Sequence, residues 1–199
     1  MSFKRLGVFG GTFDPIHNGH LIAAAEISKK LNLDKVFFVP TGEPWQKGET
    51  TDSKLRLEMT KLAISGYPNF EISAIDIDRA GPTYTRDTLQ DFRKLYPDAE
   101  LTFIAGADAM TEIDSWQYAE DLPKLAKFVA VSRPGYEYVP PKSKGWQGES
   151  QITLVEIAAM AVSSTEIRAK VNAGISIQGL VPDSVLKFIE KHELYRENK

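Results

Sequence analysis

A regular alternation between short apolar runs and segments with helical apolar spacing constrains the fold of this chain most strongly. Strands are expected at residues 6–9, 35–39, 70–73, 101–105, 128–131 and 152–155, and helices at 21–31, 55–62, 89–96, 116–126, 164–173 and 182–192. Strands that alternate with helices are joined by right-handed crossovers into a mostly parallel sheet with both faces covered. The sequence therefore predicts an α/β fold with a doubly wound, mostly parallel sheet.

Length and composition fit one globular domain. The 199 residues include 42% hydrophobic residues and no cysteine, so disulfides, thiol nucleophiles and cysteine-bound metals are excluded. No repeat or linker divides the chain, and we expect a single domain over 1–199 whose last ~35 residues form a small helical subdomain. The longest apolar run, 157–162, is far too short to span a bilayer. A soluble, cytoplasmic chain without a membrane partner is expected.

The loop after the first strand carries the clearest chemical signal. It reads GGTFDPIHNGH over residues 10–20, with no dinucleotide-binding G-x-G-x-x-G and no phosphate-binding P-loop. Gly10 and Gly11 let the backbone approach a ligand closely. His17 and His20 lie three residues apart at the start of the expected helix, so they share one face with the free N–H groups there. This arrangement favours a phosphate-binding site.

Simpler interpretations of the same loop remain open. Any strand-to-helix turn can use paired glycines, and a single histidine near a helix start is more often structural. The H-x-x-H spacing also suits a metal, but His192 is the chain's one other histidine, so a third ligand is not evident. Phosphate contact is therefore favoured over metal ligation.

Four further segments each have a functional and a structural interpretation. Ser163, Ser164 and Thr165 precede a helix, where they can cap it or hold phosphate, and Arg168 lies one turn later. Arg133 follows a strand, where it could bind phosphate or simply be an exposed surface residue. Asp108 follows another strand and could accept hydrogen bonds from ribose hydroxyls. Trp116 could stack on an aromatic ligand or simply pack in the core.

The run over 10–20 resembles the signature of the HxGH nucleotidyltransferases, which transfer a nucleotidyl group to a phosphate-bearing acceptor. Almost the whole chain is similar to the bacterial nicotinate-nucleotide adenylyltransferases. That similarity is carried by residues 79–85, 87–89, 103–108, 116, 128–135, 162–168 and 180–182. The resemblance implies a Rossmann-like nucleotidyltransferase fold, with ATP and nicotinate mononucleotide as substrates of a step in NAD biosynthesis. It also implies Mg²⁺ held mainly by ATP phosphates and water, without a dedicated protein metal site.

The resemblance also assigns roles to individual residues. The catalytic residues it implies are His17, His20, Lys47 and Arg168. Those implied to bind ATP are Gly10, Gly11, Thr12, Phe13, Gly106, Asp108, Arg133, Ser163, Ser164 and Thr165. Those implied to bind the nicotinate nucleotide are Thr83, Tyr84, Thr85, Trp116 and Gln117. The expected reaction is in-line attack on the α-phosphorus without a covalent enzyme intermediate.

Three positions, Trp45, Gln46 and Gln117, depart from the family pattern. Many relatives carry Pro-Pro-His-Lys after the second strand, where this chain has Pro44-Trp45-Gln46-Lys47, and relatives often have tyrosine at the position of Gln117. These changes bear on turnover, loop position and pyridine recognition rather than on fold or chemistry. The sequence does not indicate the oligomeric state, and a homo-oligomer is compatible with it.

Three other functions compete with this one. A related enzyme could use nicotinamide mononucleotide, phosphopantetheine or a polyol phosphate as acceptor. A nucleotide-sensing module could keep the pocket without catalysis, although both histidines and Lys47 are present. A nucleic-acid binder is suggested by distant similarity to class I aminoacyl-tRNA synthetases. The net charge of −3 and the lack of a basic stripe argue against nucleic acid.

Overall fold

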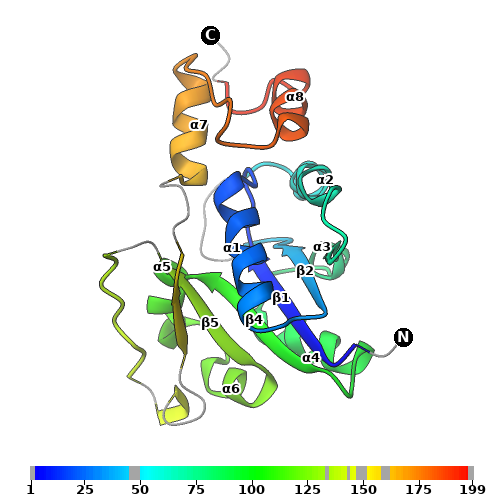
Figure 1. Cartoon of the computed structure of the whole chain (residues 1–199), viewed down its shortest axis with the longest axis vertical. Coiled ribbons are helices and arrows are strands. Elements are labelled where there is room, and N and C mark those ends of the chain that lie inside the picture. Colours follow the sequence, from blue (N-terminus) through cyan, green and yellow to red (C-terminus); the bar gives the residue numbers. More distant parts are fainter. Residues whose placement is uncertain are drawn as a thin grey trace.

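Six parallel strands form the central sheet in a computed structural model of the chain (Figure 1). The structure describes residues 3–44, 50–132, 135–142, 144–146, 152–157 and 162–196. The strands are β1 (Arg5–Gly11), β2 (Lys35–Pro40), β3 (Phe70–Ile72), β4 (Glu100–Gly106), β5 (Lys127–Ser132) and β6 (Thr153–Glu156). They are ordered β3-β2-β1-β4-β5-β6. The predicted doubly wound parallel sheet is confirmed.

Helices connect these strands. They are α1 (Asn18–Lys30), α2 (Ser53–Ile64), α3 (Ile75–Asp78), α4 (Thr85–Leu95), α5 (Ala107–Thr111), α6 (Leu122–Leu125), α7 (Ser164–Asn172) and α8 (Asp183–Lys191). Short 3₁₀ turns occur at Ile113–Ser115, Ala119–Asp121 and Lys144–Trp146. No helix in the described ranges is both long and apolar enough to cross a bilayer.

The strand order reverses between β1 and β4. From β1 the chain builds outward through β2 to β3, and it then returns to the other side of β1 with β4. In sheets of this kind, the loops at the carboxyl ends of the two central strands diverge and leave a crevice. The loops after β1 and β4 are therefore the natural walls of a binding site.

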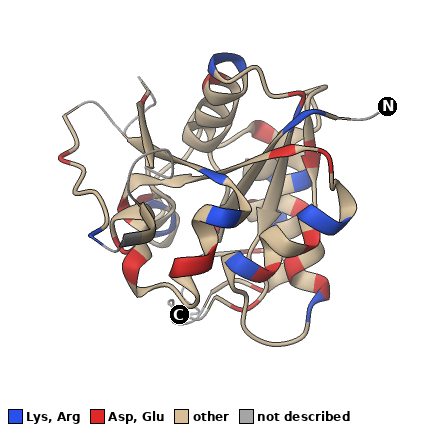
Figure 2. Cartoon of the chain, turned by 90° about the horizontal axis from the view of Figure 1, so that it is seen from below, with Lys and Arg blue, Asp and Glu red and all other residues tan. Residues whose placement is uncertain are grey.

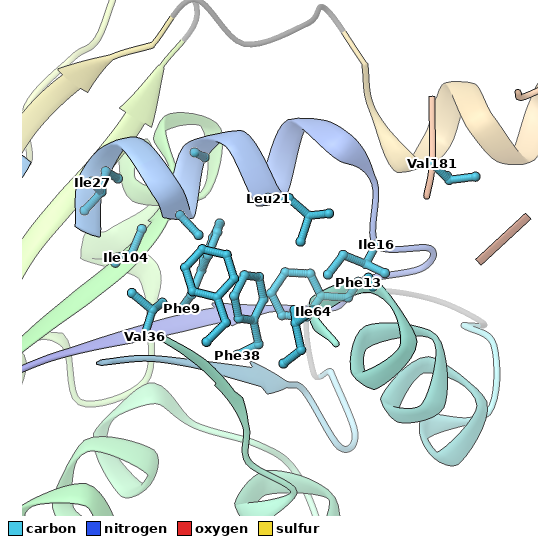
Figure 3. Close-up of a cluster of buried hydrophobic side chains, with 14 of the residues drawn as sticks. Phe9, Phe13, Ile16, Leu21, Ile27, Val36, Phe38, Ile64, Ile104 and Val181 are labelled. Carbon is cyan, nitrogen blue, oxygen red and sulfur yellow. The ribbon is translucent and has the colours of Figure 1, made fainter. Parts of the chain in front are cut away.

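Each central strand is buried on both faces, and alternate residues feed two separate cores. In β2, Val36 and Phe38 belong to one buried cluster, while Phe37 and Val39 belong to the other. The first cluster, which we name the α1-side core, lies between the sheet and α1 and is drawn in Figure 3. The second lies on the opposite face, under α4 and α5. This period of two within a continuous apolar run is typical of parallel strands.

The two C-terminal helices complete the α1-side core. Ile167 of α7 and Val185 and Ile189 of α8 are buried and belong to that cluster. The Ser184 hydroxyl of α8 donates to the carbonyl of Leu62 in α2 over 3.3 Å. Figure 1 shows both helices beyond the end of α1 at which that helix begins, so they lie next to the loop that follows β1.

The expected elements differ from the observed ones mainly between 107 and 126. A continuous helix over 116–126 was expected, but Tyr118 has a left-handed backbone (φ 63°) that interrupts it. The helix proper is confined to α6, where Pro123 occupies the first turn. The short helices α3 and α5 were not expected. Elsewhere, strand and helix boundaries agree with the apolar pattern to within a few residues.

Candidate active site

A cavity of about 710 Å³ opens at the carboxyl ends of the strands. Its walls come from the loops after β1, β2 and β4, from the end of β5 and from the N-terminal ends of α1, α4 and α7. This is the crevice that the strand order predicts. Three helix N-termini converge on it, and each contributes a partial positive charge that favours an anionic ligand.

Most of the residues that the sequence nominates line this cavity. They are Gly10, Gly11, Thr12, Phe13, His17, His20, Thr83, Thr85, Gly106, Asp108, Trp116, Ser163, Ser164, Thr165 and Arg168. Tyr84 and Gln117 are not among the lining residues. Lys47 and Arg133, together with the family departures Trp45 and Gln46, fall outside the described residues.

The two histidines of the signature lie against each other at the start of α1. His17 is the residue that caps the helix, and its ring stacks on that of His20 at 3.7 Å between centroids. The backbone N–H of His17 donates to Nδ1 of His20 over 3.2 Å. When His20 is neutral, its proton must therefore reside on Nε2. The helix itself thus fixes which nitrogen of His20 can donate a hydrogen bond.

Burial governs the charge of His17. Only 6% of this residue is exposed. Removal from water penalises the imidazolium and lowers the pKa of His17 from 6.5 to about 4. In the protein without ligand, His17 is therefore a neutral imidazole at pH 7. The sequence alone allowed either protonation state.

Buried Arg56 of α2 fixes the loops on both sides of the histidines. Its guanidinium donates to the carbonyl oxygens of Thr51, Thr12 and Gly42 over 2.8, 2.7 and 2.9 Å. Thr12 belongs to the loop after β1, and Gly42 to the loop after β2. One side chain thereby links the loop after β1 to both ends of the connection between β2 and α2.

The N-terminus of α7 faces the same loop from the other side. Ser163 caps the helix by accepting from the N–H of Glu166 over 3.2 Å, and it also lines the cavity. Ser164 donates through its hydroxyl to the carbonyl of Pro15 over 2.9 Å. Arg168 donates from Nη1 to the carbonyl of Asp14 over 2.7 Å. The α7 segment and the histidine loop are therefore linked directly.

Trp116 has features of both a core residue and a ligand-binding residue. Its ring packs edge-on against Phe103 at 6.2 Å between centroids, as a core residue would. The residue also lines the cavity, and its indole Nε1 is buried without a hydrogen-bond partner in the part of the chain that the structure describes. A buried donor at a cavity wall is available to a ligand.

The start of α4 forms a second polar corner. Thr83 is buried and accepts through its hydroxyl from the N–H of Gly42 over 3.1 Å, while Tyr84 caps the helix. The Tyr84 ring turns to Tyr118, on whose face the Arg86 guanidinium lies at 3.3 Å from the ring centre. The Tyr84 side chain therefore packs in an aromatic–cation cluster rather than in the cavity wall.

Sequence reasoning missed several polar residues of the cavity. Asp76 is buried and accepts from Thr88 and Arg79 over 2.7 and 2.8 Å, and its burial raises its pKa. Ser132 ends β5 with a buried hydroxyl that has no partner among the described residues. Asp14 lies within the signature itself but was given no role. Of these residues, only Asp14 could have been found from the sequence, because it lies within the signature. Asp76 and Ser132 reach the cavity through tertiary packing.

Comparison with known proteins agrees with this geometry. The cytidylyltransferase-like family pattern matches residues 8–170. A protein of Leifsonia xyli named "Probable nicotinate-nucleotide adenylyltransferase" is 52% identical over 98% of this chain and 96% of its own length. One of the same name from Saccharopolyspora erythraea is 50% identical over 97% of this chain and 90% of its own.

Solved structures share the fold at low sequence identity. The Plasmodium falciparum nicotinic acid mononucleotide adenylyltransferase complexed with NaAD superposes with a TM-score of 0.78 at 22% identity. That alignment covers 96% of this chain and 97% of the other. From the full-length relatives and the family pattern together, we conclude that this chain belongs to the cytidylyltransferase-like family and, within it, to the bacterial nicotinate-nucleotide adenylyltransferases.

Proposed function

We propose that this chain transfers the adenylyl group of ATP to nicotinate mononucleotide and releases deamido-NAD and pyrophosphate. One observation carries the proposal: the stacked His17 and His20 at the start of α1 and Arg168 of α7 line one cavity. Relatives about half identical over nearly their full length are named for this activity. We also place the chain in the cytoplasm, with its two soluble nucleotide substrates.

The reaction needs charge stabilisation more than proton transfer. An oxygen of the acceptor's 5′-phosphate attacks the α-phosphorus of ATP and forms a new P–O bond. The bond from that phosphorus to the α–β bridging oxygen breaks, and its electron pair leaves with pyrophosphate. The attacking group is already an anion, so no general base is required. Positioning two polyanions and neutralising the developing charge therefore supply most of the rate enhancement.

The residues around the cavity suit this task. The N-termini of α1 and α7 supply partial positive charge, Arg168 supplies a full one, and Nε2 of His20 supplies a directed donor. His17 is neutral without ligand, and a triphosphate beside it would raise its pKa and favour the imidazolium. By family resemblance, Lys47 and Arg133 add further positive charge.

A divalent cation, which we propose is Mg²⁺, completes the counter-charge. No group of three or more potential ligands from His, Asp or Glu occurs among the residues described. Mg²⁺ binds readily through phosphate oxygens and water, so ATP itself would carry the ion into the cavity. When bound, it offsets negative charge on the triphosphate.

The pyridine end of the acceptor fits the corner formed by Trp116 and the start of α4. Trp116 offers a ring for stacking and an unpartnered indole N–H. Thr83 and Thr85 stand at the N-terminus of α4, where a carboxylate is favoured by the helix dipole. A nicotinamide would present an NH₂ donor to the same positive end, and that mismatch disfavours it.

An acceptor panel tests the function. The purified chain is incubated with ATP, Mg²⁺ and nicotinate mononucleotide, nicotinamide mononucleotide, phosphopantetheine or a polyol phosphate, and pyrophosphate release is measured. We expect the highest kcat/KM with nicotinate mononucleotide. Preference for another acceptor would move the chain to a different branch of the family. Calorimetric binding of ATP without product from any acceptor would instead indicate a nucleotide-sensing module.

The same assay includes two histidine variants. His20→Ala should slow transfer by at least about 100-fold, within the range found when one oriented stabilising group is removed, with much of the ATP affinity retained. His192→Ala is the matched control, because that histidine is exposed at the end of α8 and packs on Phe188. Near-normal turnover in His20→Ala would contradict the charge-stabilisation mechanism.

A further inference from the structure

The carboxylate of Asp14 lies in the loop between β1 and α1, and each of its oxygens accepts a hydrogen bond. Asp14 is 5% exposed and lines the cavity. Its Oδ1 accepts from the Tyr195 hydroxyl over 2.7 Å, and its Oδ2 accepts from the N–H of Thr51 over 3.1 Å. Its backbone carbonyl accepts from Arg168. A buried charge is tolerated only when it is paired in this way.

Tyr195 reaches this loop from the far end of the sequence. It follows α8 and lies 181 residues from Asp14. Its backbone is left-handed, with φ 65°, a conformation that costs energy for a residue with a side chain and persists only where surrounding contacts hold it. Burial and the negative charge of Asp14 raise the pKa of Tyr195, so its hydroxyl keeps its proton and donates at any physiological pH.

The positions of three candidate catalytic residues depend on the position of Asp14. His17 follows it by three residues, and His20 is fixed to His17 through the backbone N–H. The Arg168 guanidinium is planar, so its bond to the Asp14 carbonyl orients the whole group. Small displacements of such groups reduce the rate of an in-line reaction strongly.

We propose that Tyr195 is a positioning residue for adenylyl transfer: its hydroxyl fixes Asp14, and through Asp14 it sets the placement of His17 and Arg168. The proposal deepens the function given above and rests on it. It assigns to the C-terminal turn a part in the active site, although Tyr195 itself is not among the residues that line the cavity.

Tyr195→Phe tests this directly, because it removes one oxygen and keeps the ring. We expect kcat to fall about tenfold or more while KM for ATP changes less than about threefold, since the loss acts on geometry rather than on ground-state contacts. Tyr138→Phe is the matched control. Its hydroxyl is also buried, but it has no hydrogen-bond partner among the described residues. The control should keep wild-type kcat.

A double-mutant cycle separates positioning from general loosening of the fold. If Tyr195 acts through Asp14, the combination of Tyr195→Phe with Asp14→Asn should be no slower than the worse single variant. Thermal midpoints are recorded for all variants, and kinetics are measured at least 15 °C below each. Additive losses in kcat, or a lower midpoint with unchanged kcat, would overturn the proposal.

Imidazole NMR provides a readout that does not need turnover. The chain has three histidines, so each can be followed by its ring signals. In Tyr195→Phe we expect the pKa of His17 to rise from about 4 towards 6.5 as the loop relaxes, while His192 stays unchanged. An unchanged His17 titration would reject the positioning role. A wild-type chain without transferase activity would reject the proposed function, and the NMR result would still decide the positioning role.

Discussion

Burial of His17 ties the protonation of one side chain to the stability of the whole fold. The folded chain holds this ring with a pKa of about 4, whereas the unfolded chain has the ordinary value of 6.5. Between these two values the unfolded state binds more protons. The free energy of unfolding must therefore decrease as the pH falls from about 6.5 to about 4. Below pH 4, His17 causes no further decrease.

We expect His17→Asn to remove this pH dependence, because asparagine can still cap the helix but does not titrate. The wild type should lose about 3 kcal/mol more than the variant between pH 7 and pH 4, which corresponds to a difference of about 2.5 in pKa. Urea unfolding at pH 7, 6, 5 and 4 measures the difference, and all other titrating groups are common to both chains. Parallel pH profiles would show that His17 is not buried as neutral imidazole.

Individual site residues could be predicted from the sequence only where their local spacing indicated a role. His17 and His20 were identifiable because a three-residue spacing on a helix start places both rings on one side. Asp76, Ser132 and Tyr195 were not, since each reaches the site from a segment whose local pattern is ordinary. Their roles arise from contacts between residues far apart in the chain, as with the 181 positions that separate Tyr195 from Asp14.

Among the structural elements, α2 carries the most constrained connection to the site. Arg56 is 1% exposed, and its guanidinium joins the carbonyls of Thr12, Gly42 and Thr51. These carbonyls belong to segments that flank the cavity, so the helix works as a fixed support for two loops. No apolar residue could meet three buried acceptors, and lysine has neither the fork nor the reach of arginine.

Arg56→Met should therefore destabilise the chain by about 3 kcal/mol, because three partly buried carbonyls lose their donor. It should also weaken ATP binding, since the loop at Thr12 lines the cavity. Arg56→Lys should recover only part of the stability. Urea unfolding and calorimetric titration with ATP measure the two effects.

Arg93→Met is the matched control for this prediction. Arg93 also donates to two backbone carbonyls, of Ala99 and Leu125, but it stands outside the cavity lining. We expect it to lower stability without changing ATP affinity. Wild-type stability in Arg56→Met would mean that the two loops are held by other contacts.

The elements themselves follow the sequence wherever burial is continuous. The strands β1, β2, β4 and β5 were predictable because a fully buried parallel strand must be an unbroken apolar run. The stretch between β4 and β5 was not, because its turns depend on a left-handed Tyr118 held by Tyr84 and Arg86. An apolar pattern contains no information about that cluster.

For the whole molecule, topology places one large cavity at the carboxyl ends of the strands. The net charge is −3, and Figure 2 shows basic and acidic positions interspersed along the ribbon. Extended nucleic-acid surfaces instead gather Lys and Arg on one face. The helix N-termini that converge on the crevice add partial positive charge there. The alternation of strands and helices predicted the parallel sheet, whereas the position of the strand reversal that creates this crevice comes from the structure.

The α1-side core should also make the unfolding of the sheet and of the C-terminal helices cooperative. Ile167, Val185 and Ile189 of the C-terminal helices are buried in the same cluster as Phe9 and Phe13. A helical unit packed in this way cannot detach without exposing the core of the sheet. The small C-terminal subdomain expected from the sequence should therefore not unfold as a separate step.

We expect one cooperative transition, and Ile189→Ala tests it. The substitution should cost about 3 kcal/mol and lower the thermal midpoint by roughly 5–10 °C. All three tryptophans precede α7, and Trp116 and Trp146 pack in or against the core on the α4 face of the sheet, so their fluorescence reports on the sheet. Far-ultraviolet circular dichroism instead reports on every helix. Both signals should shift together, and exposed Lys187→Ala should shift neither. An early loss of helical signal with unchanged fluorescence would show that α7 and α8 unfold independently, and the shared core would then not couple them to the active-site loop.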